Sequence, residues 1–519
     1  MGLLSCLAPL LPVRSTAHST ASTSTLVEKG FIEGKSSADS DEDRVVVDTG
    51  ARLDELRREL DRAGADVYVV PTADAHGSEW VGACDERRAF VSGFTGSSGV
   101  AVVTKTEAHL FTDSRYYVQA GKQLDSHWTL QKVGEEGVEN WDKWILDLPG
   151  GSKIGIDPTL LDYGTGKALS QAVKTRSLSL VFPSANLVDA IWRSRPPRSA
   201  APIQPHPFKF TGESASSKLT SLRKYLREKY PAGDDKEEPA YLVTTLPAIA
   251  WLLNLRGDDI AHNPVFYAYV LVTERECVLW VQSAALASDE VRRAVSEFGG
   301  RVEEYGDALE GLRREREGKA GKVVTDAKAS WAVVDLLGEE NVEIVKSPIE
   351  TAQAVKNEVE IEGFRRAYLR DGAAWAHWQA WLEETIACGK EVTEWSAAEK
   401  LTEYRRRQKC FAGLAYENIS ATGENAALPH YEPSPSRPVP LSLSTPYLND
   451  SGAQYLDGTI DTTRTMWLGR KSPSREHKRA FTRVLQGHIA VDALVFPEGT
   501  TGEQVDVLAR APLWSEGMN

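Results

Sequence analysis

The chain has 519 residues, of which 41% are hydrophobic and 26% charged, and its formal net charge is −14 at pH 7. This is the composition of a globular protein with room for two to four domains, and its acidic balance argues against nucleic acid or an anionic membrane surface as a partner. No apolar run reaches transmembrane length, and five cysteines without CxxC spacing indicate a reducing compartment.

Residues 1–48 differ in composition from the rest, and we expect them to form a disordered extension. Residues 1–27 contain no acid, a single Arg and many Ser and Thr. One Arg is few for a transit peptide, so we expect a cytoplasmic protein. A mitochondrial location is the alternative if residues 1–27 do act as a transit peptide.

The segment 49–195 has the pattern of an α/β domain. Residues 51–63 predict an amphipathic helix with three leucines on its inner side, and residues 66–72 predict a buried strand. A second strand is expected at 100–104. The proline-rich stretch 193–207 marks the boundary with the next domain.

Residues 205–346 repeat this order of elements. A helix is expected at 218–229, followed by strands at 240–244 and 269–273. Two copies of one α/β unit, separated by a proline-rich linker, indicate a duplication. We therefore expect the two domains to share one strand order.

A third domain is expected over residues 350–519. The pattern predicts helices at 356–386, 393–407, 475–494 and 502–514. Pro512 is expected to break the last of these helices, because proline lacks the backbone N–H.

The stretch 446–469 reads as a β-hairpin with its turn at Asp457-Gly458. If Leu448 faces Thr463, then Asp450 and Asp461 lie directly opposite each other on one face of the sheet. Opposed like charges destabilise a sheet, so a divalent cation is expected between them. The alternative is that the pair binds no metal, since aspartate is common in turns, and Asp457 itself is expected to serve only the turn.

Four short motifs follow one another along the third domain: NISATG at 418–423, PHY at 429–431, DSG at 450–452 and DTTRT at 461–465. This succession resembles the metal-dependent aminopeptidase P family, and the resemblance extends over roughly residues 50–517. It implies an α/β (α+β) protein with two related creatinase-type domains before an incomplete pita-bread domain. It also implies removal of the N-terminal residue from peptides with proline in second position.

The resemblance assigns roles to four residues. Asp450 and Asp461 match ligands of a dinuclear site that usually holds two Mn²⁺ ions. His430 matches a histidine that contacts substrate and handles a proton, and Arg115 matches an arginine that reaches towards the bound peptide. The alternatives are a turn histidine at 430 and an Arg115 that simply pairs with Asp113. The other histidines, among them His127 and His262, are expected to be structural.

The resemblance also places a histidine and two glutamate ligands beyond Asn519. We therefore expect this chain, as written, to bind Mn²⁺ weakly and to be inactive, and we favour a shortened version of a longer protein. A chain released from catalysis would have no physical reason to retain the aspartate pair. The alternative function is a non-catalytic peptide-binding module of the same fold. Peptides beginning Xaa-Pro are the expected partners, and a homodimer is the expected assembly.

Overall fold

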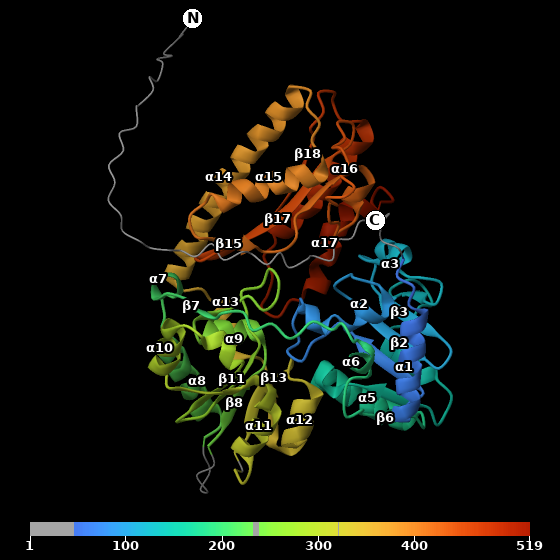
Figure 1. Ribbon diagram of the computed structural model, residues 1–519. Helices are drawn as coiled ribbons and strands as arrows, with labels where there is room; N and C mark the ends of the chain where they lie inside the picture. The colour runs from blue at the N-terminus through green and yellow to red at the C-terminus, as the bar shows by residue number, and fades with distance from the viewer. Residues whose placement is uncertain (1–45, 232–237, 320, 519) are drawn as a thin grey trace, which may run out of the picture. The chain divides into compact units, whose positions relative to one another are not determined.

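The computed structural model describes residues 46–231, 238–319 and 321–518. The expected disordered extension comprises residues 1–48, and the alternative transit peptide comprises residues 1–27. Residues 1–45 lie outside the described range. The described strands form two six-stranded sheets, a four-stranded sheet and a two-stranded sheet (Figure 1).

The first six-stranded sheet has helices on both faces. Its order is β4-β3-β2-β1-β5-β6, with β1 at Val67–Pro71, β2 at Val100–Thr104, β3 at Ala108–Thr112, β4 at Thr129–Lys132, β5 at Lys153–Ile156 and β6 at Ser179–Val181. Alternate residues of β1 enter two different cores. Tyr68 and Val70 pack with Leu53 of α1 (Gly50–Ala63). Val67 and Val69 pack in the core that contains Leu169 of α5 (Tyr163–Thr175).

The second six-stranded sheet repeats the first. Its order is β12-β11-β10-β8-β13-β14, with β8 at Ala240–Val243, β10 at Ala268–Val272, β11 at Cys277–Val281, β12 at Gly300–Glu304, β13 at Val323–Asp326 and β14 at Val342–Val345. Every neighbouring pair has the same parallel or antiparallel sense as its counterpart in the first sheet. The predicted duplication is thus confirmed at the level of topology.

The remaining helices of these two units have 4–9 residues, apart from α8 with 15. They are α2 (Arg87–Ser92), α3 (Tyr117–Gln123), α4 (Trp141–Trp144), α6 (Leu187–Ile191), α7 (Phe208–Thr211), α8 (Ala215–Lys229), α9 (Leu246–Leu252), α10 (Asp289–Glu297), α11 (Ala308–Arg316) and α12 (Trp331–Leu337). A two-stranded sheet pairs β7 (Gln204–Pro205) with β9 (Leu255–Arg256). The helix predicted at 218–229 is α8, which begins three residues earlier because Ser214 caps its start.

The third unit is an antiparallel sheet packed against two helices. Its strands are β15 (Phe411–Leu414), β16 (Ile419–Thr422), β17 (Tyr447–Tyr455) and β18 (Gly458–Met466), and β17 pairs with the other three. After α13 (Pro348–Ala354), the helices α14 (Glu358–Ala387) and α15 (Glu394–Arg406) pack against this sheet (Figure 1). Trp378 of α14, Leu401 of α15 and Tyr447 of β17 share one core.

The hairpin forms as predicted, but its register differs by two residues. Leu448 pairs with Thr465 rather than with Thr463, and Asp461 lies opposite Gly452. Tyr455 pairs with Gly458, so the connection is Leu456–Asp457, one residue before the predicted Asp457–Gly458 turn. The predicted pairing of Leu448 with Thr463 would have needed a connection at Tyr455–Leu456, so the predicted turn and the predicted pairing were incompatible with each other. The two aspartates still share a face because the shift is an even number of residues. They are diagonal neighbours rather than directly opposed.

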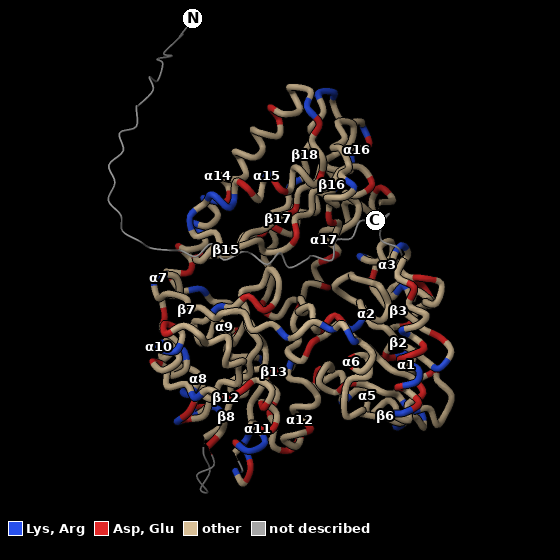
Figure 2. The backbone as a smooth tube through the Cα atoms, in the orientation of Figure 1, with Lys and Arg blue, Asp and Glu red and all other residues tan. Residues whose placement is uncertain are grey.

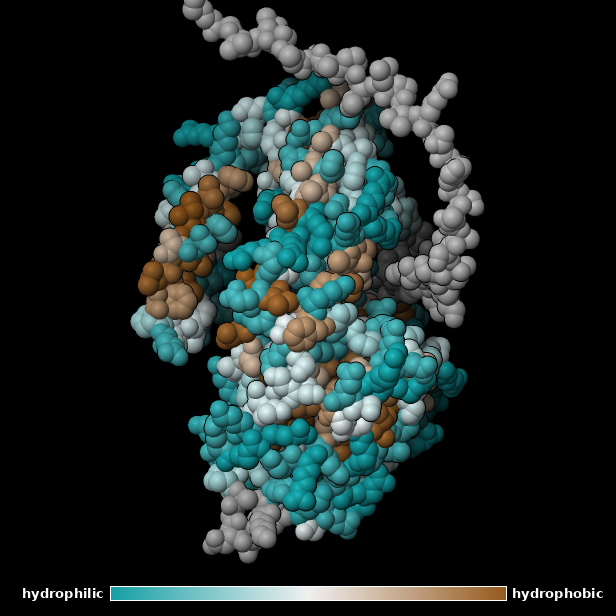
Figure 3. Space-filling view, turned by 90° about the vertical axis from the view of Figure 1, so that its left-hand side faces the viewer, coloured by the Kyte–Doolittle hydropathy of each residue, from teal (hydrophilic) through white to brown (hydrophobic). Residues whose placement is uncertain are grey.

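The last two helices are α16 (Arg475–Asp492) and α17 (Gly502–Trp514), which pack against each other. Contrary to expectation, α17 continues through Pro512. The proline removes the hydrogen bond that its N–H would make to the carbonyl of residue 508, and the helix ends two residues later at Trp514. Apolar side chains reach the surface of the molecule, as the brown atoms in Figure 3 show, and this helix pair with its connection exposes several: Phe481, Val484, Leu485, Ile489, Val495, Phe496, Val507 and Trp514.

Charged residues of both signs alternate along the surface helices. Figure 2 shows this clearly around α11, where Arg313 pairs with Glu310 and Arg314 with Glu303. On α11, charges of opposite sign therefore pair with each other or with the neighbouring strand β12. Of the helices described, none combines the length and the apolar character needed to cross a membrane.

Candidate metal centre

The two hairpin aspartates converge on a single atom, the hydroxyl oxygen of Tyr416. This oxygen lies 2.6 Å from Oδ1 of Asp450 and 2.8 Å from Oδ1 of Asp461. Burial, together with the hydrogen bonds to both carboxylates, raises the pKa of the Tyr416 phenol far above its ordinary value. The phenol therefore remains protonated and shares one proton between two carboxylates.

The donor set at this point fits a divalent cation. Within the described part of the chain, no Lys or Arg forms an ion pair with Asp450 or Asp461, so their charges are offset only by the Tyr416 hydroxyl. Asp450 is half-buried and Asp461 is exposed. Carboxylate oxygens suit hard ions such as Mn²⁺ or Mg²⁺. Asp450 and Asp461 are the residues that would hold such an ion.

The opposite face of β17 is held by a buried ion pair. Arg405 of α15 contacts Asp371 of α14 through Nε at 2.9 Å and Nη2 at 3.0 Å, and both side chains are buried. The same guanidinium donates to the carbonyl of Ser451 at 3.3 Å, and Tyr455 donates to Asp371 at 3.0 Å. A bidentate pair of this kind fixes the strand that carries Asp450 against the two helices.

His430 lies beside this centre and contacts the first α/β unit. Its Nδ1 is 2.5 Å from the hydroxyl oxygen of Tyr116, whose ring meets the imidazole edge-on with centroids 5.2 Å apart. Partial burial and the nearby Arg115 charge lower the pKa of His430, while the charges of Asp113 and Asp450 oppose this shift. The imidazole is therefore neutral at neutral pH and stands within the electrostatic reach of Asp450.

Arg115 forms an ion pair with Asp113, which was the alternative to its role in peptide binding. Its Nε and Nη2 donate to the two carboxylate oxygens of Asp113 at 2.7 and 2.8 Å. The guanidinium also lies 5.1 Å from the ring centroid of Tyr116. Arg115, Tyr116 and His430 thus form one cluster, and the Nη1 donors of Arg115 are not engaged by Asp113.

The second α/β unit also reaches this region, through a histidine expected to be only structural. His262 has a left-handed backbone with φ of 63°. Its Nε2 is 3.2 Å from Oε1 of Glu417, the residue after Tyr416, and its carbonyl accepts from Gln454 at 3.0 Å. Burial alone would lower the pKa of His262, but the Glu417 carboxylate outweighs it and the pKa is raised. His262 therefore links the second unit to the hairpin.

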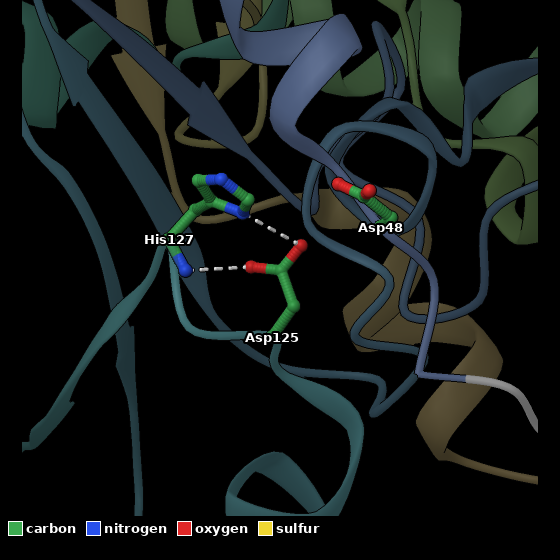
Figure 4. A group of neighbouring side chains, drawn as sticks. All are labelled: Asp48, Asp125 and His127. Atoms are coloured by element: carbon green, nitrogen blue, oxygen red, sulfur yellow. Dashed lines mark hydrogen bonds and ion pairs between the residues drawn. The ribbon is translucent and has the colours of Figure 1, made fainter.

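A separate carboxylate and histidine cluster forms at the start of α1, where Asp48, Asp125 and His127 lie together (Figure 4). His127, which we expected to be structural, lies 3.2 Å from Oδ2 of Asp125 through its Nδ1. Hydrogen bonds account for the arrangement, however. Asp125 accepts from the backbone N–H of Thr49 at 2.6 Å and from its hydroxyl at 2.8 Å, and Asp48 accepts from Gly50. The cluster caps the first turn of a helix.

Sequence reasoning missed two residues of this region. Tyr416 stands two positions before the NISATG motif, and a tyrosine in a loop carries no signal by itself. Glu394, whose buried carboxylate binds the segment that carries His430, looks like an ordinary helix-start acid in the sequence. Only the folded chain shows what these two side chains contact.

Three family models match consecutive parts of the chain. Models described as the creatinase/prolidase N-terminal domain match residues 52–191 and 194–360, and the metallopeptidase family M24 model matches residues 362–519. These matches cover the two α/β units and the sheet with the aspartate pair.

Curated relatives from fungi are similar over most of the chain. A probable Xaa-Pro aminopeptidase P of Aspergillus fumigatus is 42% identical over 490 residues, which are 92% of this chain and 73% of the relative. The corresponding protein of Neurospora crassa is 42% identical over 495 residues, 93% of this chain and 71% of the relative. These comparisons give no support to a non-catalytic module.

A solved structure has the same fold. The X-prolyl aminopeptidase of Caenorhabditis elegans, described as a cytosolic enzyme with a di-nuclear active site, superposes with a TM-score of 0.85 at 35% sequence identity. The match covers 91% of this chain and 78% of that one. The fold and the order of the three units are therefore shared with that enzyme.

Proposed function

The chain belongs to the Xaa-Pro aminopeptidases P of metallopeptidase family M24, and we propose that it provides the metal-binding hairpin and the substrate histidine of such an enzyme. The reaction is release of the N-terminal residue from peptides with proline in second position. The observation that carries this proposal is the convergence of Asp450 and Asp461 on one point, with no ion-paired Lys or Arg among the described residues.

Asp450 and Asp461 would hold the metal, for which we propose Mn²⁺ with two ions per site. When bound, these ions would supply Lewis-acid activation of the scissile carbonyl and of a water molecule. The contribution of the chain is to hold both carboxylates on one face of a rigid hairpin. The buried Asp371–Arg405 pair keeps that hairpin in place from its other side.

His430 would contact the substrate and handle a proton. A Tyr116 hydroxyl that donates to Nδ1 leaves the proton of the neutral ring on Nε2. From there the imidazole can donate a hydrogen bond to the reacting carbonyl group. The lowered pKa of His430 supports this role, because the ring is neutral at the pH at which it would act.

Arg115 would bind the peptide with the donors that Asp113 leaves available. The bidentate pair with Asp113 fixes the plane of the guanidinium. A fixed guanidinium can recognise a peptide carbonyl or a carboxylate without first ordering its own side chain.

We further propose a cytoplasmic location, a homodimer and domain boundaries at 49–195, 205–346 and 350–519. The first of these rests on the cytosolic description of the Caenorhabditis elegans enzyme. The boundaries rest on the two six-stranded sheets and the separate hairpin sheet.

The test uses an Arg-Pro-Pro peptide, with Arg-Ala-Pro as the matched control. Peptide release is measured with and without Mn²⁺, for the 519-residue chain and for this chain joined to the C-terminal part of a fungal relative. For the joined protein we expect Mn²⁺-dependent release of Arg from Arg-Pro-Pro and none from Arg-Ala-Pro. This release should be lost in the Asp450→Asn and Asp461→Asn variants of the joined protein. A joined protein that folds yet cleaves neither peptide at saturating Mn²⁺ would contradict the proposal.

A further inference from the structure

Glu394 is a fully buried acid, and the hydrogen bonds that its carboxylate accepts from the residues that the structure describes all come from neutral groups. It is the first residue of α15 and its side chain has 0% exposure. Burial raises the pKa of this carboxyl, while hydrogen bonds from Tyr431, Thr422 and Asn425 oppose that shift. Within the described ranges, no Lys or Arg contributes to this shift. Burying a carboxylate in this way is costly unless its oxygens are fully hydrogen-bonded.

The hydrogen bonds to this carboxylate come from one segment of the chain. Oε1 accepts from the backbone N–H of Thr422 at 2.6 Å, and Oε2 accepts from the hydroxyl of Tyr431 at 2.6 Å. The amide of Asn425 donates to both oxygens, at 3.3 and 3.1 Å. Thr422 is the last residue of β16, and Tyr431 directly follows His430. The carboxylate therefore binds both ends of the loop that carries His430.

The loop itself offers few other means of fixing that histidine. The exposed members of the segment are Gly423, Glu424, Ala427, Pro429 and His430. Its internal backbone bonds run from Leu428 to Asn425 and from Tyr431 to Leu428. A loop with so little buried apolar surface has low local stability, so polar contacts at its ends determine where it lies.

We propose that Glu394 is a positioning residue for His430, because its carboxylate fixes the segment from Thr422 to Tyr431 beside the Asp450–Asp461 pair. This inference rests on the proposed function, in which His430 meets the substrate. Glu394 touches neither the substrate position nor the aspartates. It acts through the loop and places the imidazole where Tyr116 can bind Nδ1.

Three variants of the full chain test this role. Glu394→Gln removes the charge and one acceptor while it keeps the shape of the side chain. Tyr431→Phe removes the hydroxyl that donates to Oε2 of Glu394 and keeps the ring next to His430. It also tests the role if Glu394→Gln does not fold. Ser420→Ala is the matched control, because Ser420 bonds the backbone carbonyl of Glu394 at 2.7 Å and not its carboxylate.

The readout is the titration of the His430 imidazole by NMR, with the signal assigned by its absence in His430→Gln. The groups facing His430 are Tyr116, Arg115, Asp113, Asp450 and Glu79. We expect the pKa of His430 to rise towards its ordinary value in Glu394→Gln and Tyr431→Phe, because a loosened ring regains water, and to stay unchanged in Ser420→Ala. Loss of the Glu394 charge alone would lower that pKa, so a rise identifies a change of position.

Titration curves for Glu394→Gln and Tyr431→Phe that coincide with that of the unmodified chain, or a fall in Glu394→Gln, would overturn the proposal. An equal rise in Ser420→Ala would overturn it as well, since general loosening would then explain the effect. Failure of the proposed function would appear differently, as peptide release that survives His430→Gln. The NMR measurement does not depend on that release.

Discussion

Tyr116 and His430 lie 314 positions apart in the sequence, yet the tyrosine hydroxyl and the imidazole Nδ1 are 2.5 Å apart. Tyr116 is 1% exposed and belongs to the core of the first α/β unit. The same hydroxyl is 2.5 Å from Oγ of Ser97, so its bond to His430 belongs to a short polar chain. A rigid side chain of one unit thereby holds a loop of another.

Tyr116→Phe is expected to release His430 at a small cost in stability. The ring stays in its core, so only hydrogen bonding is lost, and the free energy of unfolding should fall by about 1 kcal/mol in a urea titration. The His430 imidazole signal should change in NMR spectra. Tyr117→Phe is the control, because the Tyr117 hydroxyl donates to the carbonyl of Val133. If both variants leave the His430 signal unchanged, Tyr116 does not hold the histidine.

Tyr416→Phe is expected to increase the affinity for Mn²⁺. The phenol hydrogen bonds to two carboxylates, and a cation must displace it from them. A hydrogen bond to a charged group contributes roughly 1.5–3 kcal/mol, so its removal should lower the dissociation constant for Mn²⁺ by about ten-fold or more. Isothermal titration calorimetry measures this change, with Asp461→Asn as the variant expected to lose binding. Unchanged or weaker binding in Tyr416→Phe would show that the phenol assists the ion rather than competing with it.

The duplication and the hairpin could be predicted because both depend on local patterns. Hydrophobic periodicity placed the strand at 100–104 without error, and the turn residues placed the hairpin. The register could not be fixed, since Leu456–Asp457 and Asp457–Gly458 both suit a tight turn. The bonds of Tyr416 and Glu394 join segments that only tertiary packing brings together. No local pattern encodes such contacts.

The stability of the chain should fall between pH 6.5 and about 4, partly through His206. Burial lowers the pKa of His206 to about 4. Its Nε2 donates to the carbonyl of Leu456 in the hairpin turn at 2.6 Å, and its Nδ1 is buried without a partner among the described residues. Between these pH values the unfolded chain binds a proton that the folded chain does not, so unfolding becomes more favourable as the pH falls. Buried His76, whose pKa burial also lowers, acts in the same direction.

Urea titrations at several pH values check this expectation. His206→Gln can still donate to Leu456 but takes up no proton, so the free energy of unfolding should depend less on pH than in the unmodified chain. Equal slopes for His206→Gln and the unmodified chain would exclude His206 as a source of the pH dependence.

Two glycines of α14 should respond to alanine in opposite ways. A Cβ at Gly363 would lie 2.3 Å from the carbonyl oxygen of Asp457 in the hairpin turn, whereas a Cβ at Gly372 meets nothing within 4 Å. Alanine favours a helix over glycine by about 0.8–1 kcal/mol, so Gly372→Ala should stabilise the protein by up to that amount. At Gly363 the clash involves backbone on both sides, and overpacking of this kind costs typically 1–3 kcal/mol. Gly363→Ala should therefore be destabilising in spite of its better helix propensity, and it should push the turn that sets the register of Asp450 and Asp461.

Urea titration gives the two free energies of unfolding, and calorimetry gives the Mn²⁺ affinity, which should fall only in Gly363→Ala. If both variants stabilise the chain equally, then α14 and the hairpin turn are not in contact, and the rigid support proposed for the aspartate pair is wrong.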